Sequence, residues 1–168
     1  MTITKNQILS PEQIFQKTKR IACEIVENNF SAKNIVLAGI HKTGFLFAEI
    51  LKKELENFCP FKILLCGIQV SKTSFTANIS VDIKLSELKN PSVIIVDDVL
   101  NTGKTLTAAL KPFLDIETSK IQVAVLIDRH HLLFPVSADY VGYSLSTTLD
   151  EMITVVFDKG KGNGVYLH

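Results

Sequence analysis

The chain has 168 residues, 46% of them hydrophobic and 21% charged, which is enough for one globular domain with a sizeable core. Its formal net charge is +1, so bulk charge gives no reason to expect a nucleic-acid or anionic-membrane partner. The first ten residues lack the apolar run of a signal peptide, and no stretch is long enough to span a membrane. We therefore expect a single domain over residues 1–168 that stays in the cytoplasm and away from membranes.

The three cysteines indicate a reducing compartment. Cys23, Cys59 and Cys66 are odd in number, lie in apolar surroundings and lack the spacing of a Cys-x-x-Cys motif. We interpret them as small core residues, which fits the cytoplasm better than an oxidising compartment. No group of His, Cys and acidic residues has the spacing of a zinc site, so we expect none.

The first predicted element is an amphipathic helix that begins after Ser10. Ser10 is the expected N-cap, Pro11 suits the first helical position, and Gln13 completes a capping box. One face of this helix is apolar, and it consists of Ile14, Thr18, Ile21, Ala22, Ile25 and Val26. We expect that face to pack on a core.

Strands and helices alternate over the rest of the chain, without a linker or a repeat. We predict strands at 33–40, 61–70, 79–83, 93–96, 121–128, 152–157 and 165–167, helices at 45–58 and 105–114, and irregular structure at 129–148. This alternation predicts an α/β domain with a mainly parallel sheet flanked by helices. Ligands of such sheets bind beyond the carboxyl ends of the strands, where the loops 41–44, 71–78 and 97–105 should converge.

The turn at 101–105 has the chemistry of a phosphate site. Its residues offer backbone N–H groups, hydroxyls and an amine at the start of a predicted helix, and they are Asn101, Thr102, Gly103, Lys104 and Thr105. A nucleotide-binding P-loop is excluded, because Asp98 stands where that motif requires glycine. A helix cap with a coincidental lysine is the plainer alternative.

Two adjacent acids, Asp97 and Asp98, precede this turn directly after the apolar run 93–96. Unpaired charges beside a core are costly, so the pair indicates a function. The carboxylates could accept hydrogen bonds from a vicinal diol, and one could hold Mg²⁺ through water. A diol beside a phosphate describes a ribose 5-phosphate; a solvated strand end is the alternative reading.

The stretch VIIVDDVLNTGKT (93–105) resembles the phosphoribosyl-pyrophosphate signature of the type I phosphoribosyltransferases. Over residues 8–167 the chain is similar to the pyrimidine operon regulators of that family, which combine uracil phosphoribosyltransferase activity with RNA attenuation. The resemblance implies a phosphoribosyltransferase-like fold with a small hood. It also implies phosphoribosyl pyrophosphate and a nucleobase or nucleotide as ligands, Mg²⁺ as cofactor, and a homo-oligomer, either a dimer or a tetramer. The reaction implied is transfer of the phosphoribosyl group to a base, with uracil giving UMP and pyrophosphate.

The resemblance also implies roles for individual residues. Asp97 and Asp98 would bind the ribose hydroxyls and hold the metal through water. Together with Lys42 they would be the catalytic residues. Residues 101–105 would surround the 5-phosphate. The pyrophosphate loop would be residues 39–44, with Gly39, His41, Lys42, Thr43 and Gly44. Residues 71–78, with Lys72, would form a lid, and residues 128–142, with Asp128 and Arg129, a hood that recognises the base.

Three departures from the family pattern leave the function open. The pyrophosphate loop carries His41 and Lys42 but no arginine, and Lys72 is the only charge between Gln69 and Val81. Asn101 stands where purine-specific relatives place an acid, which disfavours a purine. The chain has just two arginines, so we do not expect RNA binding. A weakly catalytic or non-catalytic regulator that binds the sugar phosphate, with a possible link to attenuation of pyrimidine genes, is the alternative function.

Overall fold

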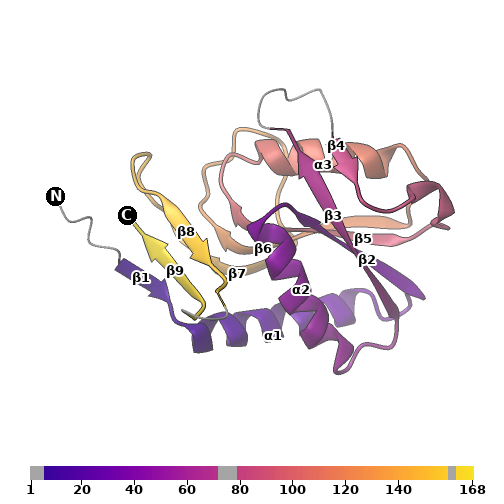
Figure 1. Cartoon of the computed structure of the whole chain (residues 1–168), viewed down its shortest axis with the longest axis horizontal. Coiled ribbons are helices and arrows are strands. Elements are labelled where there is room, and N and C mark those ends of the chain that lie inside the picture. The colour runs from indigo at the N-terminus through magenta and orange to yellow at the C-terminus, as the bar shows by residue number, and fades with distance from the viewer. Residues whose placement is uncertain (1–5, 72–78, 159–161) are drawn as a thin grey trace.

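The computed structural model describes residues 6–71, 79–158 and 162–168, and these form two β-sheets and three α-helices (Figure 1). The strands are β1 (Asn6–Leu9), β2 (Asn34–Ile40), β3 (Lys62–Val70), β4 (Ile79–Val81), β5 (Ser92–Leu100), β6 (Lys120–Asp128), β7 (Tyr140–Ser144), β8 (Ile153–Val156) and β9 (Gly164–Leu167). The helices are α1 (Pro11–Asn28), α2 (Thr43–Glu56) and α3 (Lys104–Leu114), with a 3₁₀ turn at Leu85–Glu87.

The larger sheet has the strand order β4-β3-β2-β5-β6-β7, and all its strands are parallel except β4. This confirms the predicted α/β class with a mainly parallel sheet. The pairing of β2 with β5 ends at Gly39 and Val96, whereas β5 continues beside β6 as far as Leu100 and Asp128. The end of β5 therefore projects beyond β2, and both acids lie on that projecting part.

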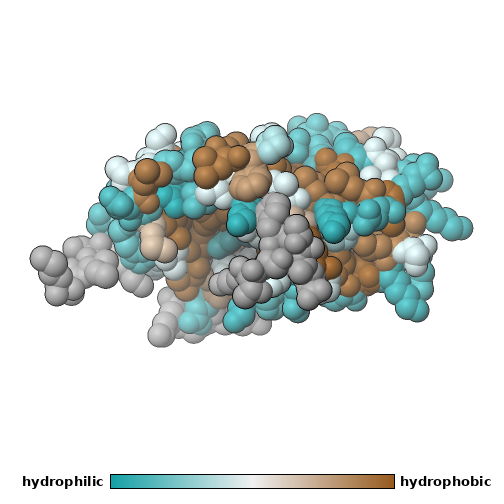
Figure 2. Space-filling model, turned by 90° about the horizontal axis from the view of Figure 1, so that it is seen from above, coloured by the Kyte–Doolittle hydropathy of each residue, from teal (hydrophilic) through white to brown (hydrophobic). Residues whose placement is uncertain are grey.

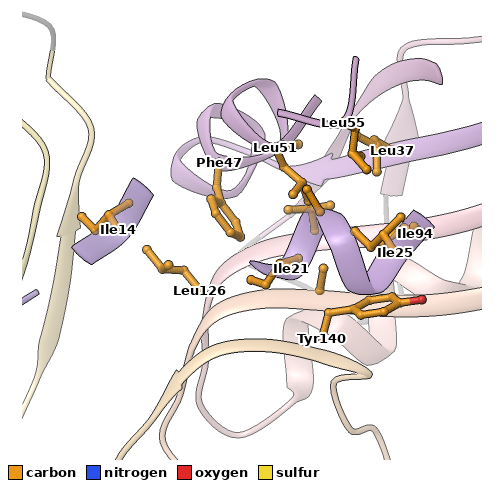
Figure 3. Close-up of a cluster of buried hydrophobic side chains, with 14 of the residues drawn as sticks. Ile14, Ile21, Ile25, Leu37, Phe47, Leu51, Leu55, Ile94, Leu126 and Tyr140 are labelled. Carbon is orange, nitrogen blue, oxygen red and sulfur yellow. The ribbon is translucent and has the colours of Figure 1, made fainter. Parts of the chain in front are cut away.

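The helices cover both faces of this sheet. One core cluster joins α1 and α2 to the sheet, and Figure 3 shows Ile14, Ile21, Phe47, Leu51 and Leu126 converging in it. A second cluster lies under α3, with Leu106, Ala109 and Phe113 against the other face. Burial on both faces explains the unbroken apolar runs of β2, β5 and β6.

Helix α1 begins as the sequence predicts. The Ser10 side chain accepts the Gln13 N–H at 3.3 Å, and the Ser10 N–H donates to the Gln13 side chain at 2.8 Å. Five of the six residues predicted for its apolar face are buried, and Val26 is half-buried against the same cluster. The local capping chemistry thus fixes where the helix starts, and the apolar stripe fixes which face it buries.

The structure differs from the prediction at four main points. The region 129–148 is not wholly irregular, because β7 pairs in parallel with β6. The unpredicted β1 pairs with β9 in a separate sheet of order β1-β9-β8, at the left of Figure 1. Strand β5 runs through the acids to Leu100, and α2 begins at Thr43 rather than residue 45. Long-range pairing decides the strands, and short strands such as β1 and β7 carry too little periodicity to reveal it.

The surface mixes hydrophobic patches with hydrophilic side chains, as Figure 2 shows for the face seen from above. The most exposed large apolar side chains include Leu133 at 79% and Leu149 at 87% of their full accessibility. Exposed apolar area marks interaction sites in many proteins. The homo-oligomer remains a prediction, and these exposed apolar side chains are compatible with it. Within the described ranges, no helix is both long and apolar enough to cross a membrane.

Gly39 sets the distance between β2 and α2, and replacing it tests that packing. A Cβ atom at Gly39 would lie 2.6 Å from Phe45 Cα and 3.0 Å from Ala48 Cβ. Gly39→Ala is therefore expected to lower the free energy of unfolding by about 1–3 kcal/mol through overpacking. Urea denaturation measures this, with the exposed Ser86→Ala as control. Equal stability of the Gly39→Ala variant and the parent would show that α2 can move away at no cost.

Candidate active site

The site lies at the point where the sheet changes its direction of winding. From β2 the chain proceeds to β3 on one side, and it later returns to β5 on the other side of β2. In open parallel sheets the crevice beyond the carboxyl ends of such a strand pair is the usual ligand site. His41 follows β2 directly, and Asp97 lies on the projecting end of β5.

A pocket of about 380 Å³ occupies this crevice. Its lining comes from four segments, and the residues are Ile40, His41, Val70, Ser71, Asp97, Lys104, Thr105 and Ala108. The three loops expected to converge therefore do meet here, as far as the structure describes them. The lid residues 72–78, with Lys72, lie outside the described residues. Ser71 belongs to the predicted loop 71–78, whereas Ala108 was not foreseen, since it belongs to no recognisable motif.

Asp97 is buried against the first turn of α2. A Cβ atom at Gly44 would lie 2.8 Å from Asp97 Oδ1 and 3.0 Å from the carbonyl oxygen of Val96. Only glycine leaves room for the carboxyl group at this position. Burial raises the pKa of Asp97 well above its usual value, and the neighbouring charge of Asp98 raises it further. The ligand-free site thus holds a carboxyl group that a cation or hydrogen-bond donors would stabilise in its charged form.

Asp98 is half-buried, and its backbone N–H donates to Asp97 Oδ1 at 2.9 Å. The charge of Asp98 lies close enough to contribute to the raised pKa of Asp97. Asp97 forms part of the pocket wall, while Asp98 is not among the residues that line that pocket. The two acids therefore have unequal positions, although the sequence suggested one shared role.

The phosphate loop, residues 101–105, is held in shape by Gly103. This residue has a φ of 82°, which glycine adopts without cost, and a Cβ atom on it would lie 2.7 Å from Val136 Cγ1. Its carbonyl oxygen accepts the Thr107 N–H at 2.9 Å and the Thr107 hydroxyl at 2.8 Å. The loop leads straight into α3, so the Lys104 and Thr105 N–H groups lie at a helix N-terminus, which favours an anion.

The pyrophosphate loop is shorter than expected. Gly39 lies within β2, and Thr43 and Gly44 already belong to the first turn of α2, so only His41 and Lys42 connect the two elements. The His41–Lys42 peptide bond is cis, and the His41 N–H donates to the Ile68 carbonyl at 2.9 Å. Both side chains are exposed. Gly39 therefore serves the packing of α2 rather than the loop itself.

The hood, residues 128–142, is bonded to the phosphate loop through the backbone. The Leu133 and Phe134 N–H groups donate to the Thr102 carbonyl at 2.9 and 3.2 Å, and the Arg129 N–H donates to the Leu100 carbonyl at 3.0 Å. A second pocket of about 370 Å³ lies between them. Its lining consists of Asn101, Thr102, Arg129, His130, His131, Leu132, Leu133 and Leu149.

Arg129 is buried, and its guanidinium group binds the segment 147–151. It donates to the Thr147 hydroxyl at 2.9 Å and to the carbonyl oxygens of Thr148 and Glu151 at 3.2 and 2.7 Å. The Asp128 carboxylate accepts the His130 N–H at 2.9 Å, which holds the turn at the end of β6. Both residues thus support the shape of the hood, whereas the sequence suggested direct recognition of the base.

His131 also contacts this segment, with its Nε2 atom 2.7 Å from the Thr147 carbonyl oxygen. Residues 147–151 therefore close one side of the second pocket through Arg129, His131 and Leu149. Sequence reasoning missed this segment, because its contacts span about twenty positions along the chain and follow no local pattern.

Within the described residues, no cluster of three or more His, Cys, Asp or Glu could enclose a metal ion. A divalent cation here would take most of its ligands from water and from a bound phosphate, as Mg²⁺ commonly does. The paired carboxyls of Asp97 and Asp98 fit that arrangement, since a nearby cation would favour their charged forms.

A model of the phosphoribosyl transferase domain matches residues 4–158. The chain belongs to the phosphoribosyltransferase family. The family resemblance of residues 93–105 is thereby confirmed. Several relatives carry the name Bifunctional protein PyrR. The one from Macrococcus caseolyticus is 35% identical over 162 residues, covering 92% of this chain and 93% of the relative. The one from Deinococcus radiodurans is 35% identical over 181 residues, covering 98% and 94%.

Solved phosphoribosyltransferase structures share the fold. A hypoxanthine phosphoribosyltransferase from Trypanosoma cruzi is 21% identical with a TM-score of 0.78, covering 96% of this chain and 95% of that chain. A hypoxanthine-guanine phosphoribosyltransferase from Bacillus anthracis is 25% identical with a TM-score of 0.71, covering 89% and 85%. The predicted phosphoribosyltransferase-like fold is confirmed.

The raised pKa of Asp97 gives a testable dependence of stability on pH. The folded protein holds the Asp97 proton more tightly than the unfolded chain does. The free energy of unfolding therefore falls as the pH rises from about 4, the pKa of this group in the unfolded chain, through its higher pKa in the folded protein. Asp97→Asn removes this pH-dependent loss of stability and keeps a side-chain oxygen that can accept the Asp98 N–H.

We expect the ligand-free Asp97→Asn variant to melt at a higher temperature than the parent at pH 7–8, with the difference shrinking toward pH 4. Thermal unfolding followed by circular dichroism across this range is the measurement, with the exposed Asp115→Asn as control. A variant that melts below the parent at every pH would contradict the assigned pKa direction.

Proposed function

We propose that this chain binds phosphoribosyl pyrophosphate with Mg²⁺ and transfers its phosphoribosyl group to a nucleobase, most plausibly uracil. The observation that carries the proposal is the convergence of a buried carboxyl group, a helix N-terminus with hydroxyls, and the His41–Lys42 loop around one pocket. These groups match, in order, a ribose hydroxyl, a 5-phosphate and a pyrophosphate. Membership of the phosphoribosyltransferase family supports the same assignment.

The chemistry is a substitution at the anomeric carbon of the ribose. A ring nitrogen of the base forms a bond to that carbon and loses its proton to solvent, and the bond from carbon to the pyrophosphate oxygen breaks. Residues 102–105 would hold the 5-phosphate, and Asp97 would accept hydrogen bonds from the ribose hydroxyls. Lys42 and the protonated form of His41 would face the leaving pyrophosphate, whose charge grows as the bond breaks. The contribution of the protein is mostly positioning and electrostatic stabilisation.

The buried acids also explain why a cation belongs at this site. Mg²⁺ would neutralise charge on the pyrophosphate and favour its departure. Asp97 and Asp98 would hold it through water, and their own ionisation would become easier in return. Lys72 of the lid would add one further positive charge.

Uracil is the favoured base for two reasons. Asn101 supplies no carboxylate near the reacting centre, whereas purine-specific relatives place an acid there, and the chain is similar to the pyrimidine operon regulators over most of its length. The base would lie beside the hood, where Asp128 and Arg129 hold the backbone in position.

We do not propose that the chain binds RNA. The guanidinium group of Arg20 donates to the carbonyl oxygens of Val141 and Gly142 at 2.7 and 2.9 Å, and that of Arg129 is bound to the segment 147–151. Both arginines therefore serve the fold, and a phosphate backbone would have to be neutralised by lysines alone.

A regulator that senses phosphoribosyl pyrophosphate without efficient turnover is the second candidate. It is favoured by the exposed His41–Lys42 loop, which lacks the bidentate fork of an arginine. Ligand binding without turnover would distinguish this candidate from the first.

Binding is the first test of the proposal. We expect Asp97→Asn and Asp98→Asn each to weaken phosphoribosyl-pyrophosphate binding by about 1.5–3 kcal/mol, because each removes a charge-assisted contact. Isothermal titration with Mg²⁺ present measures the effect, and Asp115→Asn is the matched control at the far end of α3. Unchanged affinity in both variants would remove the ribose assignment.

Turnover is the second test. We expect uracil-dependent release of pyrophosphate to be slow, since one missing donor at a growing charge typically costs about 10²–10³ in rate. Thr43→Arg adds a fork at the first residue of α2 and should raise kcat more than it lowers KM, whereas Thr43→Gln adds no charge and should not. Parent turnover of about 10 s⁻¹ or more would mean that the loop is no handicap.

A further inference from the structure

A third pocket, of about 440 Å³, lies at the opposite edge of the main sheet, where β2, β5 and β6 begin. Ten of its twelve lining residues are polar, and the lining consists of Asn28, Asn29, Ser31, Ala32, Lys33, Asn34, Lys89, Asn90, Pro91, Ser92, Ser119 and Lys120. Three lysines from three separate segments therefore surround one cavity. No acidic residue lines it, although the whole chain has 17 acids against 18 basic residues. The acids nearest along the chain, Glu27, Glu87 and Glu117, are exposed outside the lining.

The surrounding backbone helps to place two of the three lysines, Lys120 and Lys89. Lys120 donates to the carbonyl oxygen of Asn28 at 2.6 Å, which offsets the negative end of α1 and leaves two ammonium protons for a ligand. Asn90 has a φ of 46°, a left-handed conformation that asparagine tolerates, and this turn brings Lys89 to the cavity.

The floor of the cavity is rigid. The buried Asn29 accepts the Ser92 hydroxyl at 2.8 Å and donates to Ile25, Gln122 and Tyr140. These contacts join the end of α1 to β5, β6 and β7, so the cavity keeps its shape without a ligand. A preformed polar site binds with less loss of conformational freedom than one that must be ordered.

We propose that this pocket binds a compact phosphate-type polyanion, such as inorganic pyrophosphate, at a site separate from the active site. Three ammonium groups and several amide and hydroxyl donors match the charge and the many acceptor oxygens of such an anion. Ala32 and Pro91 are the only apolar residues of the lining, and no aromatic ring is present on which a base could stack. The ligand is therefore small and highly charged rather than a nucleoside.

Site-resolved titration with inorganic pyrophosphate tests the proposal. In Mg²⁺-free buffer, the amide signals of Asn34, Ser119 and Lys120 report on this pocket, while those of Thr102, Lys104 and Thr105 report on the phosphate loop. We expect saturable shifts of the first group in the parent. The double variant Lys33→Gln/Lys89→Gln keeps the Lys120–Asn28 bond and should raise the Kd of that group at least about tenfold.

The matched control is Lys19→Gln/Lys53→Gln, which removes the same charge from exposed positions on α1 and α2. It should leave the Kd of the pocket signals within about twofold of the parent. Absence of saturable shifts at the pocket in the parent would overturn the proposal. Equal weakening in the two double variants would also overturn it, because that result would show a general charge effect.

Discussion

Asp97 and Gly44 touch so closely that no other residue than glycine fits between β5 and the start of α2. This contact fixes how near the amino end of α2 comes to the projecting end of β5. Only His41 and Lys42 connect β2 to α2, so the position of this short loop is set by the same contact. The pocket depends on it in turn, since one wall is the loop after β2 and another is Asp97 itself. The arrangement of the candidate active site is thus set by one close approach of backbone to a carboxyl group.

That contact has a cost in the ligand-free protein. A carboxyl group is buried beside a second one, and its raised pKa shows that the charged form is disfavoured. Natural proteins depart from the rules of stable packing mainly where function requires it. The Asn29 network at the other edge of the sheet shows the contrast, because its buried polar groups bond to one another. Two buried polar centres in one sheet therefore differ in kind: the Asn29 network is made of neutral groups, whereas the charged form of Asp97 is disfavoured by its surroundings.

The sequence predicted those parts of the fold that local chemistry determines. The start of α1 follows from Ser10 and Gln13, and the central strands follow from apolar runs buried on both faces. The phosphate loop was visible because its residues are contiguous. Strand β7 was missed because Gly142 interrupts a short segment whose pairing with β6 is a tertiary matter. The support given by Arg129 to residues 147–151 was missed because both partners of each bond lie far apart in sequence. Ala108 carries no chemical signature, and only the folded chain brings it to the pocket.

The bonds from Leu133 and Phe134 to the Thr102 carbonyl join the hood to the loop at 101–105 through main-chain atoms, and the Val136 side chain packs against Gly103 beside them. Substitutions of the Leu133 and Phe134 side chains would therefore leave these main-chain donors in place. Insertions or deletions between β6 and residue 134 would shift the donors out of register and disturb both regions together. The length of this segment is accordingly more constrained than the identity of those two side chains.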